Sequence, residues 1–175
     1  MITGNKIGLR AIETKDLENL KNWRNLENFR KNFREHRELN SINQETWFNK
    51  LNNSTNDYMF GIITLEDNQL IGACGLLYVN WIIRSADFSF YIGINEHYID
   101  DLGFAYEATN LLLNYGFNDL NLNKIWMELY EFDHKKINFF KENFNFKTDG
   151  ILRQNCFYKG KYWDSQIISL LKSDH

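Results

Sequence analysis

The chain of 175 residues is predicted to fold as one mixed α/β domain, in which a sheet of about seven strands carries helices on its faces. Three observations lead to this prediction. β-like segments outnumber helical ones, and the helical segments interleave with them only partly. Two turn signals, Asp67-Asn68 and Lys159-Gly160, lie between β-like runs and indicate hairpins. The length suits one hydrophobic core and is short for two.

The elements of the N-terminal half follow from capping, periodicity and turn residues. Thr14 is predicted to cap a helix whose spacing includes Leu17, Leu20 and Trp23. A short strand precedes this helix, and a charged segment follows it. A second helix and a hairpin then complete this half. In order, the predicted ranges are a strand over 7–12, a helix over 14–23, the charged segment 29–38, a helix over 44–51, and the hairpin strands 58–65 and 69–79.

The C-terminal half begins with a clean two-residue alternation over 86–94. There Phe88, Phe90 and Ile92 face one way, and Asp87, Ser89 and Tyr91 face the other. A helix from about 104 to 115, a strand over 125–131 and a helix capped by Asp133 follow. The chain closes with a hairpin of 150–158 and 162–171.

The composition indicates an ordinary soluble globular protein, with 43% hydrophobic and 25% charged residues. A net charge of −3 is too small to indicate a nucleic-acid or membrane-surface partner, and neither is expected. There is no apolar run of membrane length and no signal-peptide pattern at the N-terminus. Cys74 and Cys156 are expected to be reduced in a cytoplasmic protein. No metal site is expected.

The stretch DDLGFAYEA, residues 100–108, has the outline of a loop that opens a helix and could hold a phosphate. Small residues at a first helical turn, here Gly103 and Ala105, let an anion approach the free backbone N–H groups. Two adjacent acids, Asp100 and Asp101, are unusual in such a loop. The alternative is a plain helix start that one of these two acids caps.

At this point the sequence resembles the GNAT family of acetyl-CoA-dependent N-acetyltransferases, in the branch of ribosomal-protein-alanine, diamine and amino-sugar acetyltransferases. The resemblance is carried by FAYEATNLLLNYGFNDLNLNKIWMELYEFD, together with IGLRAIETKDLENLKNWRN, RSADFSFYIG and FNFKTDGILRQNCFYKGKYWDSQIISLL. It covers nearly the whole chain, residues 1–175 as a single domain. It implies a GNAT-like fold with a mostly antiparallel twisted sheet and helices on both faces. It also implies acetyl-CoA as the co-substrate, and homodimerisation is consistent with it.

The resemblance further implies which residues contact coenzyme A. The family's loop pattern is Gln/Arg-x-x-Gly-x-Gly/Ala, and Asp100 stands where Gln or Arg is usual. The loop N–H groups would bind the pyrophosphate, and the preceding strand would pair with the pantetheine arm. Because like charges at 4 Å repel by about 4 kcal/mol at an effective dielectric near 20, Asp100 and Asp101 should turn away or be offset by lysines. The implied cofactor residues are Tyr91, Ile92, Gly93, Leu102, Gly103, Phe104, Ala105, Tyr106, Lys135, Lys136 and Phe140.

A second departure from the family pattern lies in the helix that Asp133 is predicted to cap. The family usually reads Asn-x-x-(small)-Ile-x-x-Tyr…Gly-Phe, and that Tyr protonates the departing thiolate. Here Asp133 replaces the Asn and Phe140 replaces the Tyr. Phe140 has no proton to donate. Another group or a water must then donate it, or catalysis is weak; Tyr130 is one candidate.

Transfer of an acetyl group to an amine also needs a base that takes the ammonium proton. Asp87 is the first candidate, because it lies opposite the Phe face and matches an acidic position in the related pattern Ala-Glu-Phe. Glu128, on the next strand, is the second. The alternative for each is an exposed strand carboxylate without a role.

The acceptor side is expected in the first two helices and their connection. Residues 30–38 hold four Arg/Lys and two Glu, with aromatic side chains interleaved. Such a patch suits an acceptor that also carries phosphate or carboxylate, as a nucleotide-linked amino sugar does, and suits a free polyamine poorly. The alternative is a solvated helix face with ion pairs such as Arg34–Glu38. The candidate acceptor residues are Trp23, Arg24, Arg30 and Arg34.

The predicted function is therefore acetyl transfer from acetyl-CoA to a primary amine of a small molecule, by direct attack in a ternary complex. The alternatives are a protein N-terminal acetyltransferase, and an acyl-CoA-binding module with little catalysis.

Overall fold

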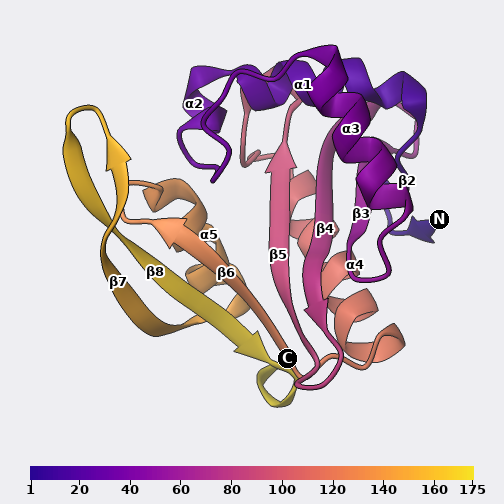
Figure 1. Cartoon of the computed structure of the whole chain (residues 1–175). Coiled ribbons are helices and arrows are strands. Elements are labelled where there is room, and N and C mark those ends of the chain that lie inside the picture. Colours follow the sequence, from indigo (N-terminus) through magenta and orange to yellow (C-terminus); the bar gives the residue numbers. More distant parts are fainter.

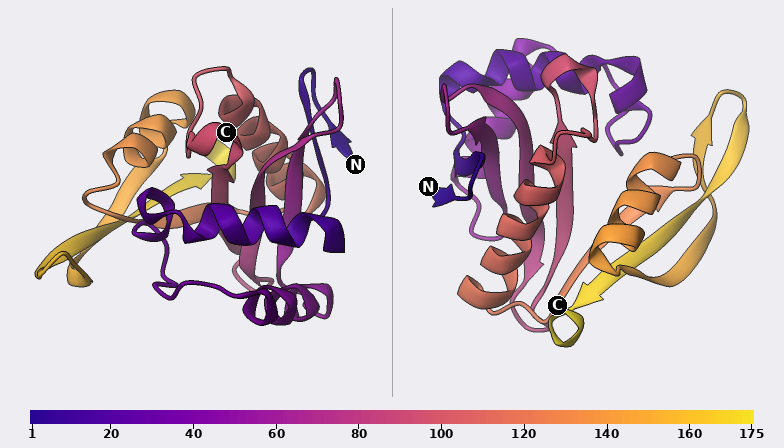
Figure 2. Two further views of the ribbon diagram at one scale, coloured as in Figure 1. Left: turned by 90° about the horizontal axis from the view of Figure 1, so that it is seen from above. Right: turned by 180° about the vertical axis from the view of Figure 1, so that it is seen from behind.

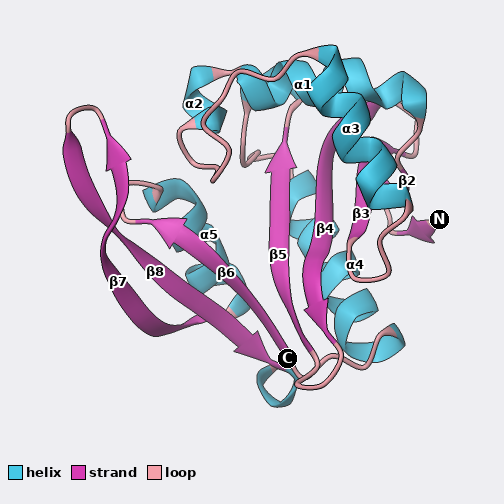
Figure 3. Cartoon of the chain, viewed as in Figure 1, coloured by secondary structure: helices cyan, strands magenta, loops and turns pink.

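A computed structural model describes residues 1–175 and contains one eight-stranded sheet. The strands are β1 Ile2–Thr3, β2 Ile7–Ala11, β3 Tyr58–Thr64, β4 Leu70–Asn80, β5 Ser85–Ile92, β6 Lys124–Tyr130, β7 Lys147–Tyr158 and β8 Lys161–Leu171. The helices are α1 Leu17–Asn25, α2 Glu27–Arg30, α3 Ser41–Asn52, α4 Phe104–Asn114 and α5 His134–Phe144. Figure 3 separates the two kinds of element by colour.

The sheet has the order β1-β2-β3-β4-β5-β6-β8-β7, and every neighbouring pair except β5–β6 is antiparallel. β5 and β6 pair only through Ser85–Lys124, Ala86–Ile125 and Asp87–Trp126. Beyond Asp87 the two strands diverge, as Figure 1 shows. The sheet is therefore open in its middle, and the backbone of β5 has a free edge there.

Helices cover both faces of the sheet, which confirms the predicted layering. In Figure 2, α1 and α3 lie on one side of the strands, and α4 and α5 lie on the other. The alternation of β5 explains this arrangement. Phe88 and Phe90 pack against Phe140 of α5, with ring centroids 5.2 and 6.3 Å apart. On the other face, Tyr91 packs against Phe29 and Phe33 at 6.0 and 5.8 Å.

Most predicted elements are present, with two differences at the N-terminus. Thr14 is not the helix cap, because a short 3-10 turn of Thr14–Asp16 precedes α1 and Glu13 holds the N-cap position. There the Asp16 carboxylate accepts a hydrogen bond from the Glu13 N–H at 2.8 Å and pairs with Arg10 at 2.7 Å. β1 has only two residues, too few for a periodic signal. Asp133 caps α5 as predicted, since its side chain accepts a hydrogen bond from the Lys136 N–H.

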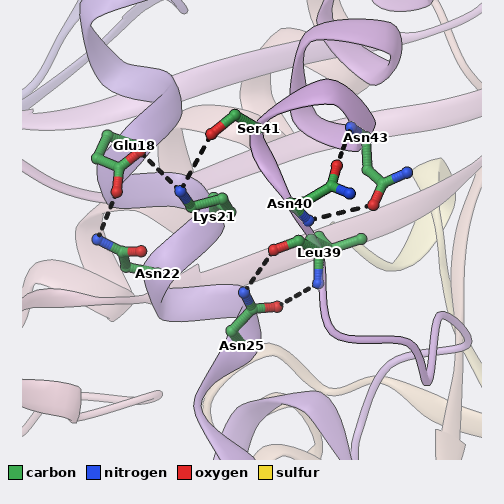
Figure 4. Close-up of polar contacts among 8 residues, drawn as sticks. All are labelled: Glu18, Lys21, Asn22, Asn25, Leu39, Asn40, Ser41 and Asn43. Atoms are coloured by element: carbon green, nitrogen blue, oxygen red, sulfur yellow. Dashed lines mark hydrogen bonds and ion pairs between the residues drawn. The ribbon is translucent and has the colours of Figure 1, made fainter.

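The connection between α1 and α3 is fixed by side-chain to backbone contacts (Figure 4). The Asn25 amide group donates to the Leu39 carbonyl at 2.8 Å and accepts from the Leu39 N–H at 2.7 Å. Asn40 and Asn43 then form a reciprocal cap at the start of α3. These contacts of Asn25 and Asn40 hold the C-terminal end of the segment 31–39, which lies next to the point where β5 and β6 diverge. None of the helices combines the length and the apolar composition that a membrane crossing requires.

Candidate active site

A cleft of about 490 Å³ lies beside the divergence of β5 and β6. Its walls come from α1, the segment 31–39, α3, the strands β3 to β6, and Lys136 of α5. The charged side chains that line it are Arg24, Arg34, Glu35, Arg37, Lys50, Asp87, Glu128 and Lys136. Sequence segments that are far apart thus place eight ionic groups around one cavity.

The two predicted candidates for the general base, Asp87 and Glu128, lie close together where β5 and β6 begin to diverge. Arg34 Nη1 lies 2.8 Å from Asp87 Oδ2, and Arg34 Nη2 lies 3.4 Å from Glu128 Oε2. Asp87 is only 7% exposed. Burial raises the pKa of its carboxyl group above the usual value, although the neighbouring Arg34 guanidinium opposes the increase. A carboxylate with a raised pKa is a better proton acceptor, so Asp87 has the environment of a general base.

Glu128 is held more firmly than Asp87. Its Oε1 accepts hydrogen bonds from Asn155 Nδ2 at 2.6 Å and from Ser165 Oγ at 2.8 Å. Both donors come from the β7–β8 hairpin. These contacts hold the Glu128 carboxylate in place on the cleft wall, where it can orient a cation.

Among the four candidate acceptor residues, Arg24 and Arg34 line the cleft, whereas Trp23 and Arg30 do not. Trp23 packs on Tyr91 with ring centroids 6.4 Å apart, and Arg30 lies 3.8 Å from Glu38 at the surface. The chain leaves the helical conformation after Arg30, so the Arg34–Glu38 pair of the alternative interpretation does not form. Arg24 has no carboxylate partner, and its guanidinium carbon lies 3.8 Å from the Phe33 ring centroid.

Tyr130 and Phe140 lie away from the reacting side of the cleft. Tyr130 packs on Phe132, with ring centroids 5.5 Å apart, and burial raises the pKa of its hydroxyl to about 12. Neither side chain lines the cleft, and Phe140 is fully buried. The structure therefore gives the two residues packing positions rather than contacts with a reacting group.

The loop before α4 has the geometry of an anion site, but its own acid occupies it. The Asp100 carboxylate accepts hydrogen bonds from the N–H groups of Leu102 at 2.7 Å, Phe104 at 3.0 Å and Ala105 at 2.6 Å. Asp100 is 6% exposed, whereas Asp101 is exposed. Asp100 thus turns towards the amides, contrary to the expectation that it would turn away.

Gly103 is required by its backbone conformation. Its φ of 91° lies in the left-handed region, and an added Cβ would meet no atom within 4 Å. A cation lies beside the loop as well, because Lys6 Nζ donates to the Leu102 carbonyl at 3.3 Å. Lys135 Nζ donates to the His97 carbonyl at 3.2 Å, just before the loop.

Other parts of the chain form hydrogen bonds with some of the backbone groups on the free edge of β5. Ile92 exchanges two backbone hydrogen bonds with Tyr98, at 2.9 and 2.8 Å. The carbonyl of Phe90, two residues earlier on the same edge, accepts a hydrogen bond from Lys136 Nζ at 2.7 Å. Lys136 therefore points into the cleft. It does not point towards the loop, so it does not offset the charges of Asp100 and Asp101 as was expected.

A comparison with protein-family models decides what kind of site this is. The model described as "Acetyltransferase (GNAT) domain" matches residues 6–143, which include the cleft, the loop and nearly all of α5. The chain belongs to the GNAT acetyltransferase family. The members of this family use acetyl-CoA as co-substrate, so the protein is an acetyl-CoA-dependent N-acetyltransferase.

Proteins that are similar to this GNAT acetyltransferase over much of its length are also N-acetyltransferases. It is 30% identical to spermidine N(1)-acetyltransferase of Vibrio cholerae, over 98% of this chain and 96% of the relative. The crystal structure of spermidine N-acetyltransferase from Vibrio cholerae in complex with CoA and spermine superposes with a TM-score of 0.87, at 29% identity and 97% coverage of each chain. A dodecameric structure of spermidine N-acetyltransferase from that organism matches at 0.78 and 28% identity, over 96% of this chain and 95% of the other. An uncharacterized N-acetyltransferase, p20, of Bacillus licheniformis is 33% identical over 66% of this chain and 63% of its own length.

Several residues beside the loop and in the cleft of this acetyltransferase were not predicted from the sequence. Lys6 is separated from the loop by 96 positions, and no local pattern links the two. Trp47 and Lys50 of α3, Glu35 and Arg37 also line the cleft. A helix over α3 was expected, but periodicity does not show which face a helix turns to a cavity, and Glu35 and Arg37 lie in a segment without regular structure.

Asp100 provides a direct test of the loop in this acetyltransferase. Asp100→Ala should tighten coenzyme A binding by about tenfold, because the variant removes the repulsion between the Asp100 carboxylate and the pyrophosphate at the loop amides. Relief of about 1.4 kcal/mol of repulsion corresponds to this factor. The variant should also lose about 1 kcal/mol of stability with its helix cap. Isothermal calorimetry with coenzyme A measures the affinity, and Asp101→Ala is the matched control, since it removes an adjacent charge that caps nothing. Equal changes in both variants, or weaker binding by Asp100→Ala, would show that Asp100 does not compete for these amides.

Proposed function

We propose that this acetyltransferase moves the acetyl group of acetyl-CoA to the primary amine of a small molecule that also carries an anionic group, such as a nucleotide-linked amino sugar. Both substrates are bound together, and the amine attacks the thioester directly. The observation that carries the proposal is the pairing of Asp87 and Glu128 around one cation, next to further cations without carboxylate partners.

The amine end of the acceptor fits the position that the Arg34 guanidinium occupies. Two carboxylates that hold this guanidinium also suit an acceptor ammonium. Arg34 is a long side chain, 45% exposed, on a segment without regular structure, so it can swing away as the acceptor enters. Asp87 then takes the proton of the attacking amine, and Glu128 orients it.

The anionic end of the acceptor fits the opposite wall. The cleft is lined by five Arg/Lys side chains and three carboxylates, so cations are in excess. Arg24 has no carboxylate partner, and Trp47 and Phe33 offer flat faces nearby. A guanidinium binds phosphate or carboxylate in a bidentate geometry, and aromatic faces stack on a base or a sugar.

The residues fit coenzyme A at two places. The backbone edge of β5 around Phe88 and Phe90 is unpaired with β6 and suits the pantetheine arm. The converging N–H groups of 102–106 suit the pyrophosphate once the Asp100 carboxylate withdraws, and Lys6 and Lys135 lie close enough to add positive charge. When bound, acetyl-CoA supplies the activated acetyl group.

A polyamine acceptor is the second candidate. It is supported by the named activity of the Vibrio cholerae relative and by the three carboxylates Glu35, Asp87 and Glu128 in the cleft. The Glu35 carboxylate, however, is engaged by Arg37, whose guanidinium Nη2 lies 2.7 Å from Oε2. This pairing leaves less negative charge for a multivalent cation.

The acceptor class is tested by the release of free thiol from acetyl-CoA. We expect turnover with a nucleotide-linked amino sugar, and at least tenfold lower kcat/KM with spermidine and with peptides that have free N-termini. Arg24→Gln should raise KM for the anionic acceptor and leave KM for spermidine unchanged. Faster turnover of spermidine would establish the polyamine reading. Coenzyme A binding without turnover of any amine would favour a binding module.

We also propose that the protein assembles with copies of itself, as the dodecameric Vibrio cholerae relative does. The β7–β8 hairpin projects from the rest of the molecule in Figure 1 and carries exposed Ile151, Leu152, Phe157 and Tyr162. Light scattering at several protein concentrations measures the assembly.

A further inference from the structure

Two departures from the family pattern occur on the same face of α5. In the pattern Asn-x-x-(small)-Ile-x-x-Tyr, Phe140 replaces the proton-donating Tyr, and Lys136 occupies the position of the small residue. Residues four apart on a helix lie one above the other. One acidic hydroxyl is therefore absent from this face, and one ammonium group has been gained one turn before it.

The Lys136 side chain is buried without an ion pair. The residue is 6% exposed, and its Nζ has no carboxylate within 4.0 Å. Its hydrogen-bond acceptor is the Phe90 carbonyl at 2.7 Å. A buried cation without a counter-charge is unfavourable for stability, and such groups often serve function.

The groups that face Lys136 are few. Its Nζ lies 4.8 Å from the Tyr98 ring centroid and 5.7 Å from that of Phe33. The charges that act on it are the Asp133 and Asp87 carboxylates and the Arg24 guanidinium. The Tyr98 hydroxyl is turned to Asp133, to which it donates at 2.6 Å, and is not available as a donor in the cleft.

Lys136 and Asp87 act on the same strand from different positions. Phe90, whose carbonyl binds Lys136, follows Asp87 by three residues, or about 10 Å along an extended chain. Both side chains line one cavity. An acyl thioester that lies along the free edge of β5 between these positions has the Asp87 carboxylate on the side of the attacking amine. It has the Lys136 ammonium group on the side of the thioester sulfur.

We propose that Lys136 is the proton donor to the thiolate that leaves during acetyl transfer. The amine nitrogen forms a bond to the acyl carbon, the carbon–sulfur bond breaks, and its electron pair remains on sulfur. A proton passes from Lys136 Nζ to this sulfur and yields the free thiol. The attacking nitrogen loses its proton to Asp87. Lys136 regains a proton from solvent and Asp87 releases one, so the protons balance. The inference rests on the acetyltransferase activity and not on which acceptor is used.

The acidity of the ammonium group agrees with this role. Burial lowers the pKa of Lys136 to about 8, against the opposing effect of Asp133 and Asp87. A thiol has a pKa near 8.5, so the proton moves between groups of similar affinity. The ammonium form is still the major one at neutral pH.

Four variants test the proposal with whichever amine the wild-type enzyme acetylates. Lys136→Met and Lys136→Arg should each lower kcat at least tenfold, because a guanidinium keeps the charge but does not release a proton. The calorimetric Kd for coenzyme A should stay within threefold of the wild type. Lys136→Met/Phe140→Tyr should not regain the lost kcat, because the side chain at position 140 is fully buried and does not line the cleft. Lys141→Met, on the same helix but bound to Gln166 outside the cleft, should leave kcat unchanged.

Three results would overturn the proposal. Full activity in Lys136→Arg would show that only the charge matters. Tighter coenzyme A binding with undiminished kcat in Lys136→Met would show that Lys136 obstructs the site. Recovery of kcat in the double variant, with its coenzyme A affinity intact, would show that position 140 and not position 136 faces the departing sulfur. Absence of turnover in the wild type itself would instead contradict the proposed function.

Discussion

Replacing Asp87 with Asn should lower kcat/KM by about 10²-fold or more, the usual effect of removing a general base. Asn keeps the size of the side chain and a hydrogen-bond acceptor for Arg34, but it does not take a proton. The loss should be greatest at lower pH, where the acceptor amine is mostly protonated. The residual activity should rise with pH, because the free amine then forms in solution. Steady-state kinetics from pH 5 to 9 measure this.

The wild-type profile should have an acid limb that is set by protonation of the Asp87 carboxylate. Because burial raises the pKa of the Asp87 carboxyl, the activity should begin to fall at a higher pH than an exposed aspartate would require. Glu128→Gln is the matched control, since it removes the other carboxylate that contacts Arg34. The acid limb of the profile should stay in place in Glu128→Gln, and in Asp87→Asn it should move to the higher pH at which the acceptor amine itself loses its proton. An acid limb at the wild-type position in Asp87→Asn would place the base elsewhere.

Replacing Lys136 with Met should stabilise the folded protein at pH 7, by up to about 3 kcal/mol. This value follows from a lysine pKa lowered from 10.5 to about 8 by folding, at 1.36 kcal/mol for each unit. The sign follows from proton binding. Between pH 8 and 10.5 the unfolded chain binds more protons at Lys136 than the folded one, so the wild-type free energy of unfolding rises with pH across this window. Below pH 8 the full destabilisation by the buried cation is present.

Urea denaturation of both proteins at pH 7 and at pH 10.5 tests this. The difference between Lys136→Met and the wild type should be large at pH 7 and small near pH 10.5. Lys141→Met is the control for the loss of one lysine from α5. An equal stability difference at both pH values would show that Lys136 is not buried as a cation.

Periodicity and capping predicted much of the fold. The alternation of Phe88 and Phe90 with Asp87 and Tyr91 predicted the two faces of β5, and both faces are present. The cap at Asp133 was predicted from one residue type and is confirmed. Thr14 was predicted wrongly as a cap, because Glu13 and Asp16 satisfy the start of that segment instead. The family resemblance, and with it acetyl-CoA as co-substrate, is confirmed.

The sequence by itself thus determined the elements, the family and the residue types available for chemistry, because each depends on neighbours along the chain. Only the tertiary structure decided which of these groups meet. Arg34 reaches Asp87 across 53 positions, and Lys136 reaches the Phe90 carbonyl across 46. Asp100 needed the left-handed turn at Gly103 to reach the amides of its own loop. Burial and charge act over a few ångströms in space, and those distances are fixed only when the strands have paired and diverged.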